Sequence, residues 1–373
     1  MTKIDTVKAF VFRYPLLKPV ITSFGIMNDR PMVLVCISDK DGQKGWGEVW
    51  CNFPLIGAEH RARLIDNVFS PLLENKLIEN PEKTFDDLTE STNVLSIQSG
   101  ENGPISQCIA GIDIALHDLL AKKENVPIWK KFGGKNNKVP IYASGINPTD
   151  PVSVVQKELN KGITAFKLKI GFGLDKDLKN IEAVKNIISK NNLLMVDVNQ
   201  AWNLSQAIDQ GKMLENFDLN WLEEAIPANS PLENWKKLKA NIKIPLAAGE
   251  NFFSDETFNG FMNMNLFSIL QPDLAKWGGF TKCISLSKRI VSTGINFCPH
   301  FLGGGIGLIA SAQLLSASSS KGLLEVDCNP NPLRSDLVGN MLNLNPGFAT
   351  LSDKPGLGYE PDLNKINKYL VAH

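Results

Sequence analysis

The chain has 373 residues, of which 43% are hydrophobic and 21% are charged, and 39 basic side chains balance 39 acidic ones. This composition is ordinary for a globular protein and excludes a disordered chain or a collagen-like repeat. Proteins that bind nucleic acid usually carry a basic surplus, so the zero net charge argues against nucleic acid as a partner.

The sequence also bears on the cellular compartment. No stretch approaches 18 consecutive apolar residues, which argues against a membrane span, and residues 1–15 lack the pattern of a signal peptide. The six cysteines are widely spaced, without a C-x-x-C motif. This spacing favours reduced thiols over a disulfide framework or a zinc ribbon. We therefore expect a cytoplasmic protein with no membrane partner.

The first third of the chain has a mixed pattern. Residues 6–14 and 33–38 are rich in β-forming residues and predict strands, whereas residues 106–123 carry an apolar stripe at helical spacing. Residues 124–135 contain Pro and paired Gly, which are typical of a boundary between units. These patterns predict an α+β unit over residues 1–125.

From about residue 139, eight short apolar runs alternate with helical stretches. Polar residues at the ends of the runs recur every 23 to 28 residues, enough for one strand, one helix and two turns: Ser144, Lys169, Asp197, Glu223, Glu250, Asp273, His300 and Glu325. This pattern predicts an α/β fold, a (β/α)7β TIM-like barrel over residues 135–345. The alternative is an open doubly wound sheet, which would not need a polar residue at nearly every strand end.

Three carboxylates end three consecutive predicted strands: Asp197, Glu223 and Glu250. Because strand C-termini converge at one mouth of a barrel, these anions should meet and require a cation. Oxygen ligands alone favour a hard ion, and we predict Mg²⁺. The alternative is that each is a surface or helix-capping acid.

Lys167 and Lys169 flank Leu168 in the second predicted strand and therefore share a face, which should point into the barrel. Two neighbouring ammonium groups, when desolvated, lower each other's pKa, and a lysine near neutrality can act as a general base. The alternative is an exposed edge strand.

His300 and Asp273 end neighbouring predicted strands, so Asp273 can fix the tautomer of His300 and raise its pKa. His300 would then be a second base or a protonated acid.

Glu325 could hydrogen-bond a substrate oxygen, or a developing oxyanion if protonated. Asn199 shares a face with Asp197 and either contacts substrate or supports the site. The glycines at 303–307 predict a turn that opens a helix, whose N-terminus could help hold an anion.

Together these motifs resemble the enolase superfamily, in its mandelate racemase subgroup. The matching segments are Gly45-Trp46-Gly47-Glu48, residues 111–118, Lys167-Leu168-Lys169, Asp197-Val198-Asn199, Trp221-Leu222-Glu223-Glu224, Gly249-Glu250-Asn251, Gln271-Pro272-Asp273 with Gly278-Gly279, Pro299-His300, and Pro355-Gly356-Leu357-Gly358. The resemblance implies that residues 1–125 cap the barrel and that residues 345–373 return to the cap.

The resemblance also implies an activity. A small carboxylate-bearing substrate, an acid sugar or its lactone, would ligate Mg²⁺, and Lys169 and His300 would face it from opposite sides to form and use an enediolate. We expect dehydration first. The alternatives are lactone cycloisomerisation, racemisation or epimerisation of a 2-hydroxy acid, and a catalytically silent sugar-acid binding protein. Cap loops with Phe24 and Trp50 should choose the substrate, and related proteins imply a homo-oligomer.

Two details depart from the subgroup's pattern or refine it. Ala225 stands where a proline usually follows the second acid, which alters the loop more than the chemistry. Lys276 lies three residues after Asp273 and is not the lysine that serves as base in the muconate-lactonising subgroup. Residues 169–178 and 331–334 are most similar to galactarolactone cycloisomerases, in which setting Arg334 is expected to be structural.

Overall fold

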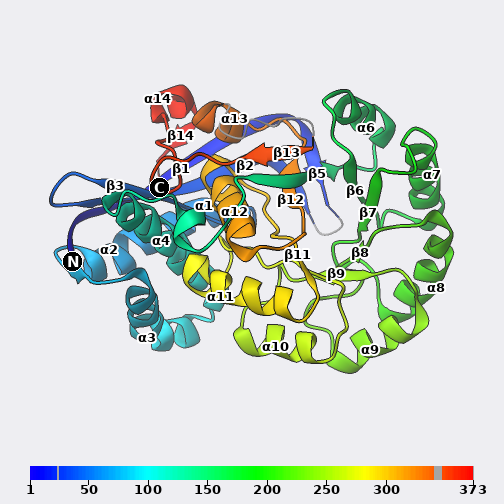
Figure 1. Cartoon of the computed structure of the whole chain (residues 1–373), viewed down its shortest axis with the longest axis horizontal. Helices are drawn as coiled ribbons and strands as arrows, with labels where there is room; N and C mark the ends of the chain where they lie inside the picture. The colour runs from blue at the N-terminus through cyan, green and yellow to red at the C-terminus, as the bar shows by residue number, and fades with distance from the viewer. Residues whose placement is uncertain (23–24, 340–346, 373) are drawn as a thin grey trace.

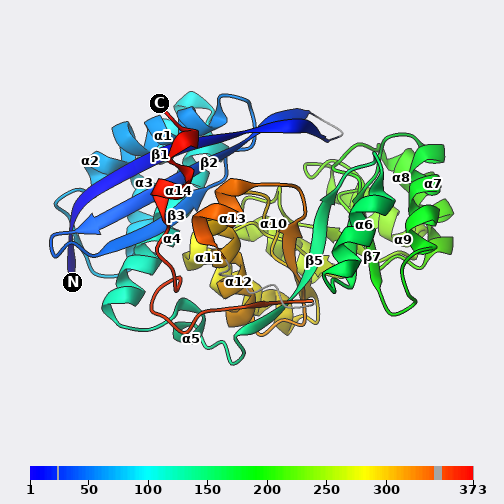
Figure 2. The same cartoon turned by 90° about the horizontal axis from the view of Figure 1, so that it is seen from above.

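The structure, a computed structural model, describes residues 1–22, 25–339 and 347–372. Two units lie side by side: an antiparallel sheet with its helices, and a larger α/β unit (Figures 1 and 2). The smaller unit has strands β1 (Thr2–Ile21), β2 (Ile26–Asp39), β3 (Lys44–Val49), β4 (Leu77–Ile78) and β14 (Leu370–Val371). Its helices are α1 (Gly57–Leu64), η1 (Ile65–Phe69), α2 (Ser70–Leu73), α3 (Pro81–Ser99) and α4 (Asn102–Lys123), and α5 (Ile128–Lys131) follows.

The small sheet has the order β14-β1-β2-β3, so the C-terminal strand pairs with the N-terminal one. Strand β1 is longer than the predicted strand over residues 6–14. It continues beyond Pro15 because β2 pairs with it as far as Ile21, after a shift in register between Pro15 and Val20. The hairpin of β1 and β2 extends from the small unit towards the barrel (Figure 2).

The larger unit contains eight parallel strands, which coincide with the eight apolar runs of the sequence. They are β5 (Lys138–Ile146), β6 (Ala165–Lys169), β7 (Leu193–Asp197), β8 (Leu222–Glu223), β9 (Leu246–Ala248), β10 (Ile269–Leu270), β11 (Asn296–Phe297) and β12 (Leu324–Asp327). Their order is β11-β10-β9-β8-β7-β6-β5-β12, and β13 (Phe348–Thr350) pairs antiparallel with β5. The predicted TIM-like α/β barrel is confirmed.

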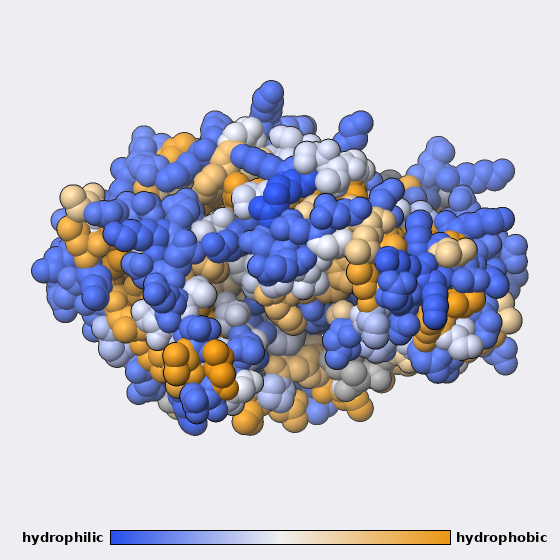
Figure 3. Space-filling model, turned by 90° about the horizontal axis from the view of Figure 1, so that it is seen from below, coloured by the Kyte–Doolittle hydropathy of each residue, from blue (hydrophilic) through white to orange (hydrophobic). Residues whose placement is uncertain are grey.

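Helices alternate with these strands and cover the outside of the sheet (Figure 1). They are α6 (Pro151–Asn160), α7 (Leu174–Lys185), α8 (Leu204–Leu214), η2 (Glu215–Phe217), α9 (Leu232–Asn241), α10 (Asp255–Asn263), α11 (Gly279–Ser292) and α12 (Gly305–Ser318), and α13 (Pro332–Val338) follows β12. The short helices α14 (Leu363–Ile366) and η3 (Asn367–Tyr369) precede β14 and lie beside the small unit (Figure 2). Of the helices in the described part of the chain, none is both long and apolar enough to cross a membrane. The face drawn in Figure 3 is mostly hydrophilic, with hydrophobic residues in separate patches.

The seam between β11 and β12 is joined by side chains. The hydroxyl of Ser320 accepts a hydrogen bond from the Phe297 amide at 3.1 Å and donates to the Phe297 carbonyl at 3.0 Å. The Leu323 amide donates to Sγ of Cys298 at 3.3 Å. These bonds link β11 to the segment that leads into β12, and so connect the two ends of the parallel strand order.

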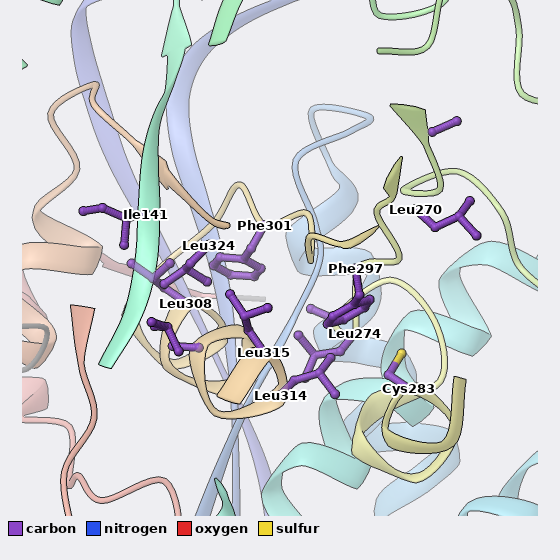
Figure 4. Close-up of a cluster of buried hydrophobic side chains, with 14 of the residues drawn as sticks. Ile141, Leu270, Leu274, Cys283, Phe297, Phe301, Leu308, Leu314, Leu315 and Leu324 are labelled. Atoms are coloured by element: carbon purple, nitrogen blue, oxygen red, sulfur yellow. The ribbon is translucent and has the colours of Figure 1, made fainter. Parts of the chain in front are cut away.

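Side-chain alternation divides the barrel into an interior and an outer layer. Tyr142, Met195 and Trp221 pack in a small interior cluster, whereas Phe166 and Leu168 belong to the large core between strands and helices. Figure 4 shows part of this outer core, in which Leu308, Leu314 and Leu315 of α12 lie near Leu324 and Phe297. The two lysines that alternate with Phe166 and Leu168 therefore point inward, as predicted.

The small unit is held together by close backbone packing and is joined to the barrel by a buried carboxylate. Strand β3 approaches helix α4 so closely that a Cβ at Gly47 would overlap the carbonyl oxygen of Gly111. The next residue, Glu48, accepts hydrogen bonds from the amides of Gly304 and Gly307 at the start of α12. The segment 303–307 therefore opens a helix, as expected, and the anion at its N-terminus is Glu48. Burial raises the pKa of Glu48 to about 7, although these amides oppose the rise.

Candidate active site

A cavity of about 180 Å³ lies at the mouth of the barrel, between the strand ends and the small unit. Five residues predicted from the sequence line it: Trp50, Lys169, Asn199, Glu250 and His300. The predicted Phe24 lies outside the described residues. The residues that end different strands are thus brought to one place, which is what a site at the mouth of a barrel requires.

His300 is held on both ring nitrogens. Its Nδ1 lies 2.8 Å from Oδ2 of Asp273, and its Nε2 lies 2.8 Å from Oε2 of Glu250. Burial lowers the pKa of His300, but the carboxylates of Glu250 and Glu325 and the hydrogen bond with Asp273 raise it well above its usual value. The expected pairing of Asp273 with His300 is present, and it favours a protonated imidazole.

Lys169 ends β6 and lines the cavity, several strands away from His300, which follows β11. Lys169 and Asp197 are register partners on β6 and β7, and Lys169 Nζ lies 2.5 Å from Asp197 Oδ2. Burial and Lys167 lower the pKa of Lys169. Asp197 and Glu223 raise it by more, so the pKa lies above its usual value. Lys167 thus lowers the pKa of Lys169, as predicted, but the expected net depression is wrong for this set of side chains, because the carboxylates outweigh the second ammonium group.

Lys167 lies beneath the cavity instead of on its wall. Its ammonium group is fully buried, contacts Oε1 of Glu223, and lies 2.9 Å from Oε1 of Glu325 and 3.6 Å from Oδ2 of Asp197. Burial lowers its pKa, but these carboxylates raise it well above the usual value. Lys167 is thus a buried cation that neutralises the acids of the site.

Glu325 is buried under His300, where it accepts hydrogen bonds from the hydroxyl of Ser144 and from the Phe301 amide. Its Oε2 lies 3.8 Å from Nε2 of His300. Burial raises the pKa of Glu325, but Lys167 and His300 bring it below the usual value. These neighbours favour the ionised form of Glu325, which would accept a hydrogen bond from a substrate hydroxyl, over the protonated form that would donate to an oxyanion.

The carboxylates of the site are set close to cations. Among the described residues, no three carboxylate, imidazole or thiol groups are already arranged to hold a metal ion. Instead, Asp197 contacts Lys169, Glu223 contacts Lys167, and Glu250 contacts His300. All candidate ligands are nonetheless oxygen donors, which suit a hard cation.

Glu224 is a residue that the sequence reasoning did not assign to the site. It directly follows β8, with a φ of 42°. Its Oε1 accepts a hydrogen bond from Asn251 at 2.7 Å, whereas its buried Oε2 has no partner among the described residues. Burial and the carboxylates of Glu250 and Asp197 raise its pKa well above the usual value. A buried carboxylate oxygen without a donor, facing two further carboxylates, is a position that a divalent cation fits. The adjacent acids Glu223 and Glu224 were the one sequence feature that could have indicated a role for Glu224.

Lys276 is a second cavity residue that had no role in the site predicted from the sequence. It lines the cavity, its Nζ lies 2.8 Å from Oδ1 of Asn251 and 3.3 Å from Oε2 of Glu250, and it stands 4.6 Å from the centre of the Trp50 ring. The predicted Trp50 thus lines the cavity and contacts the barrel through a cation–π interaction. The backbone amide of Asn199 donates a hydrogen bond to Oδ1 of Asp197 at 2.8 Å, which holds Asn199 in place.

Family models match both parts of the chain. The model of the mandelate racemase / muconate lactonizing enzyme N-terminal domain matches residues 6–133, and the model described as enolase C-terminal domain-like matches residues 152–365. The D-galactarolactone cycloisomerase of Agrobacterium fabrum is 28% identical over 98% of both chains, and the arabinonate dehydratase of Saccharolobus solfataricus is 26% identical over 89% of both. A crystal structure of a mandelate racemase/muconate lactonizing enzyme from Bordetella bronchiseptica is 44% identical, covers 99% of each chain and superposes with a TM-score of 0.93.

Proposed function

Because the chain belongs to the mandelate racemase / muconate lactonizing enzyme family, we propose that it is a lyase or isomerase that uses Mg²⁺ to remove the proton α to a carboxylate. We further propose that the substrate is an acid sugar and that the overall reaction is its dehydration. The supporting observation is that Lys169, Glu250 and His300 line one cavity, with His300 oriented by Asp273.

Asp197, Glu223 and Glu250 are the proposed ligands of Mg²⁺, and Glu224 is proposed as a fourth carboxylate in contact with it. When bound, the cation supplies positive charge beside the substrate carboxylate and offsets the negative charge that develops on deprotonation. The buried, unpartnered oxygen of Glu224 supports this assignment. So does the crowding of acids, because burial and neighbouring carboxylates also raise the pKa of Glu223, to about 7.

Lys169 is the proposed base that accepts the α-proton at Nζ. Its ammonium form is favoured by Asp197, so this role requires the charge of Asp197 to be engaged elsewhere, as it would be when Asp197 ligates a cation. Lys167 stays protonated between its buried carboxylates and orders them.

His300 is the proposed acid. The contact between Asp273 and Nδ1 leaves Nε2 directed at Glu250, on the cavity wall, and the raised pKa keeps the ring protonated. A protonated imidazole there can deliver a proton to a leaving hydroxyl, which completes the loss of water. The same two groups, one on each flank, would also serve racemisation, because one can take a proton that the other returns.

Lactone cycloisomerisation is the second candidate. It is favoured by the full-length similarity to a D-galactarolactone cycloisomerase, which covers 98% of the chain. Both reactions begin with removal of the same α-proton, so the two candidates share the roles of Lys169 and His300 and differ in the group that departs from the next carbon.

The test is a screen of mono- and diacid sugars and their lactones with MgCl₂, in which NMR identifies the product. A 2-keto-3-deoxy acid is expected, and Lys169→Met and His300→Asn should each lower kcat by about 10² to 10⁴. Lys236→Met, on an exposed pair with Glu233, is the control and should leave turnover unchanged. Wild-type activity in both site variants contradicts the two-group assignment. Binding of an acid without any conversion supports the catalytically silent binding protein instead.

A further inference from the structure

The strand order divides the mouth of the barrel into sides. The proposed metal ligands Asp197 and Glu223 end β7 and β8, and Glu250 follows β9. Lys169 and His300 lie on either side of them, on β6 and after β11. The remaining side is formed by β12 and β5, which pair with each other. If the reacting carboxylate is held at β7–β9, the rest of the substrate extends towards β12 and β5.

That side carries a buried arginine from the small unit. Arg30 of β2 lines the cavity, is only 2% exposed, and donates through Nη2 to Oδ2 of Asp327 at the end of β12. Its Nε has no acceptor among the described residues. A guanidinium group has five N–H donors, and a buried donor without an acceptor is costly, so this edge of Arg30 is suited to an external acceptor.

The charges here do not cancel. Arg334 also contacts Asp327, at 3.5 Å, so two guanidinium groups share one carboxylate. Asn329 donates to Oδ1 of the same carboxylate at 2.7 Å, and Asn147 beside it has a buried Oδ1 without a partner in the described part of the chain. Arg30, Arg334 and Asp327 together therefore carry one surplus positive charge, and Arg30 and Asn147, which line the cavity, have a buried donor and a buried acceptor without partners among the described residues.

We propose that Arg30 binds a second, distal carboxylate of the substrate, and that the substrate is therefore a dicarboxylic acid sugar. This inference rests on the proposed function, because the first carboxylate must lie at β7–β9 for the second to reach Arg30. An anion pairs with the surplus guanidinium charge, and a planar carboxylate matches the fork of an arginine better than a hydroxyl does. The open oxygen of Asn147 would accept a hydrogen bond from a hydroxyl of the same chain.

The test compares six-carbon diacids (galactarate, glucarate, mannarate) with the matching monoacids (galactonate, gluconate, mannonate), by titration calorimetry with MgCl₂. Wild-type protein should bind the best diacid at least tenfold more tightly than its monoacid. Arg30→Met should weaken the diacid by about 10- to 150-fold, the range for a hydrogen bond to a charged group, and leave the monoacid within threefold. Arg30→Lys keeps a charge for Asp327 and tests the same point if the first variant does not fold; it should weaken the diacid alone, by a smaller factor.

Arg13→Met is the matched control, because Arg13 pairs with Glu59 and Asp29 within the small unit and does not line the cavity. It should change neither affinity. Equal losses for diacid and monoacid in Arg30→Met would show a structural role and overturn the inference, as would a wild-type protein that binds no diacid of the panel or does not prefer it.

Recording α-proton exchange on the same samples separates the two proposals. Exchange that is as fast with monoacids as with diacids overturns the role of Arg30 and leaves the proposed function standing. Diacid binding that depends on Arg30, without exchange of any acid, overturns the proposed function alone.

Discussion

Lys167→Met offers the sharpest test of the buried charge cluster. The Lys167 ammonium group is completely buried, contacts Glu223, and lies 2.9 Å from Glu325 and 3.6 Å from Asp197. Removing the cation leaves these carboxylates buried with fewer partners. Breaking a buried ion pair on one side costs about 3–5 kcal/mol, and we expect a loss in this range in the free energy of unfolding.

Urea unfolding at pH 7, followed by circular dichroism, measures this loss. The matched control is Lys236→Met, whose exposed pair with Glu233 spans 2.7 Å and should cost less than about 1 kcal/mol. The reasoning about the cluster is refuted if Lys167→Met lies within 1 kcal/mol of the wild type, or if both variants lose the same amount.

The pH dependence of the loss has a definite sign. In the wild type, burial raises the pKa of Glu325, but Lys167, His300, Ser144 and Lys169 together bring it below the usual value. The contribution of Glu325 to stability is therefore present at neutral pH and is lost on acidification. Without Lys167, the largest of these opposing effects is missing, so the folded-state pKa of Glu325 is higher than in the wild type and the variant loses less stability as pH falls. The difference in stability between wild type and Lys167→Met should therefore shrink as pH falls from 7 to the usual glutamate pKa of 4.5, and a difference that grows contradicts the account.

Two further variants test the fold and the metal site. Gly47→Ala places a Cβ against the carbonyl of Gly111 and should cost about 1–3 kcal/mol in urea unfolding, whereas the open position Gly260→Ala should not destabilise the protein. Glu224→Gln should weaken Mg²⁺ binding at least tenfold by calorimetry, with no acid sugar present. Unchanged Mg²⁺ affinity would remove Glu224 from the proposed ligands.

The barrel could be predicted from sequence because its signal is local and repeated. Each strand is a short apolar run, and each run ends in a polar residue at nearly constant spacing, so the ends of β6 to β12 could be named in advance. Lys169 and His300 were found in this way, since their positions follow from strand alternation and from the convergence of strand ends.

What the sequence did not reveal depends on neighbours that are distant in the chain. The continuation of β1 past Pro15 follows from pairing with β2, and no local pattern specifies it. The pKa of Lys169 is raised by Asp197 and Glu223, which lie on two other strands of the barrel, and their effect outweighs that of the neighbouring Lys167. Strand alternation places only Glu223 inward, so it provided no reason to expect Glu224 in the site. Glu224 has a left-handed backbone conformation, and its carboxylate interacts with those of Glu250 and Asp197.

The central claim is that Lys169 and His300 face one α-carbon across a single cavity. Its most direct measurement is incorporation of deuterium at the α-carbon of an acid sugar in D₂O with MgCl₂, followed by ¹H NMR in wild type, Lys169→Met and His300→Asn. We predict exchange in the wild type, its loss in Lys169→Met, and continued exchange without product in His300→Asn. Exchange in Lys169→Met at the wild-type rate would contradict the claim.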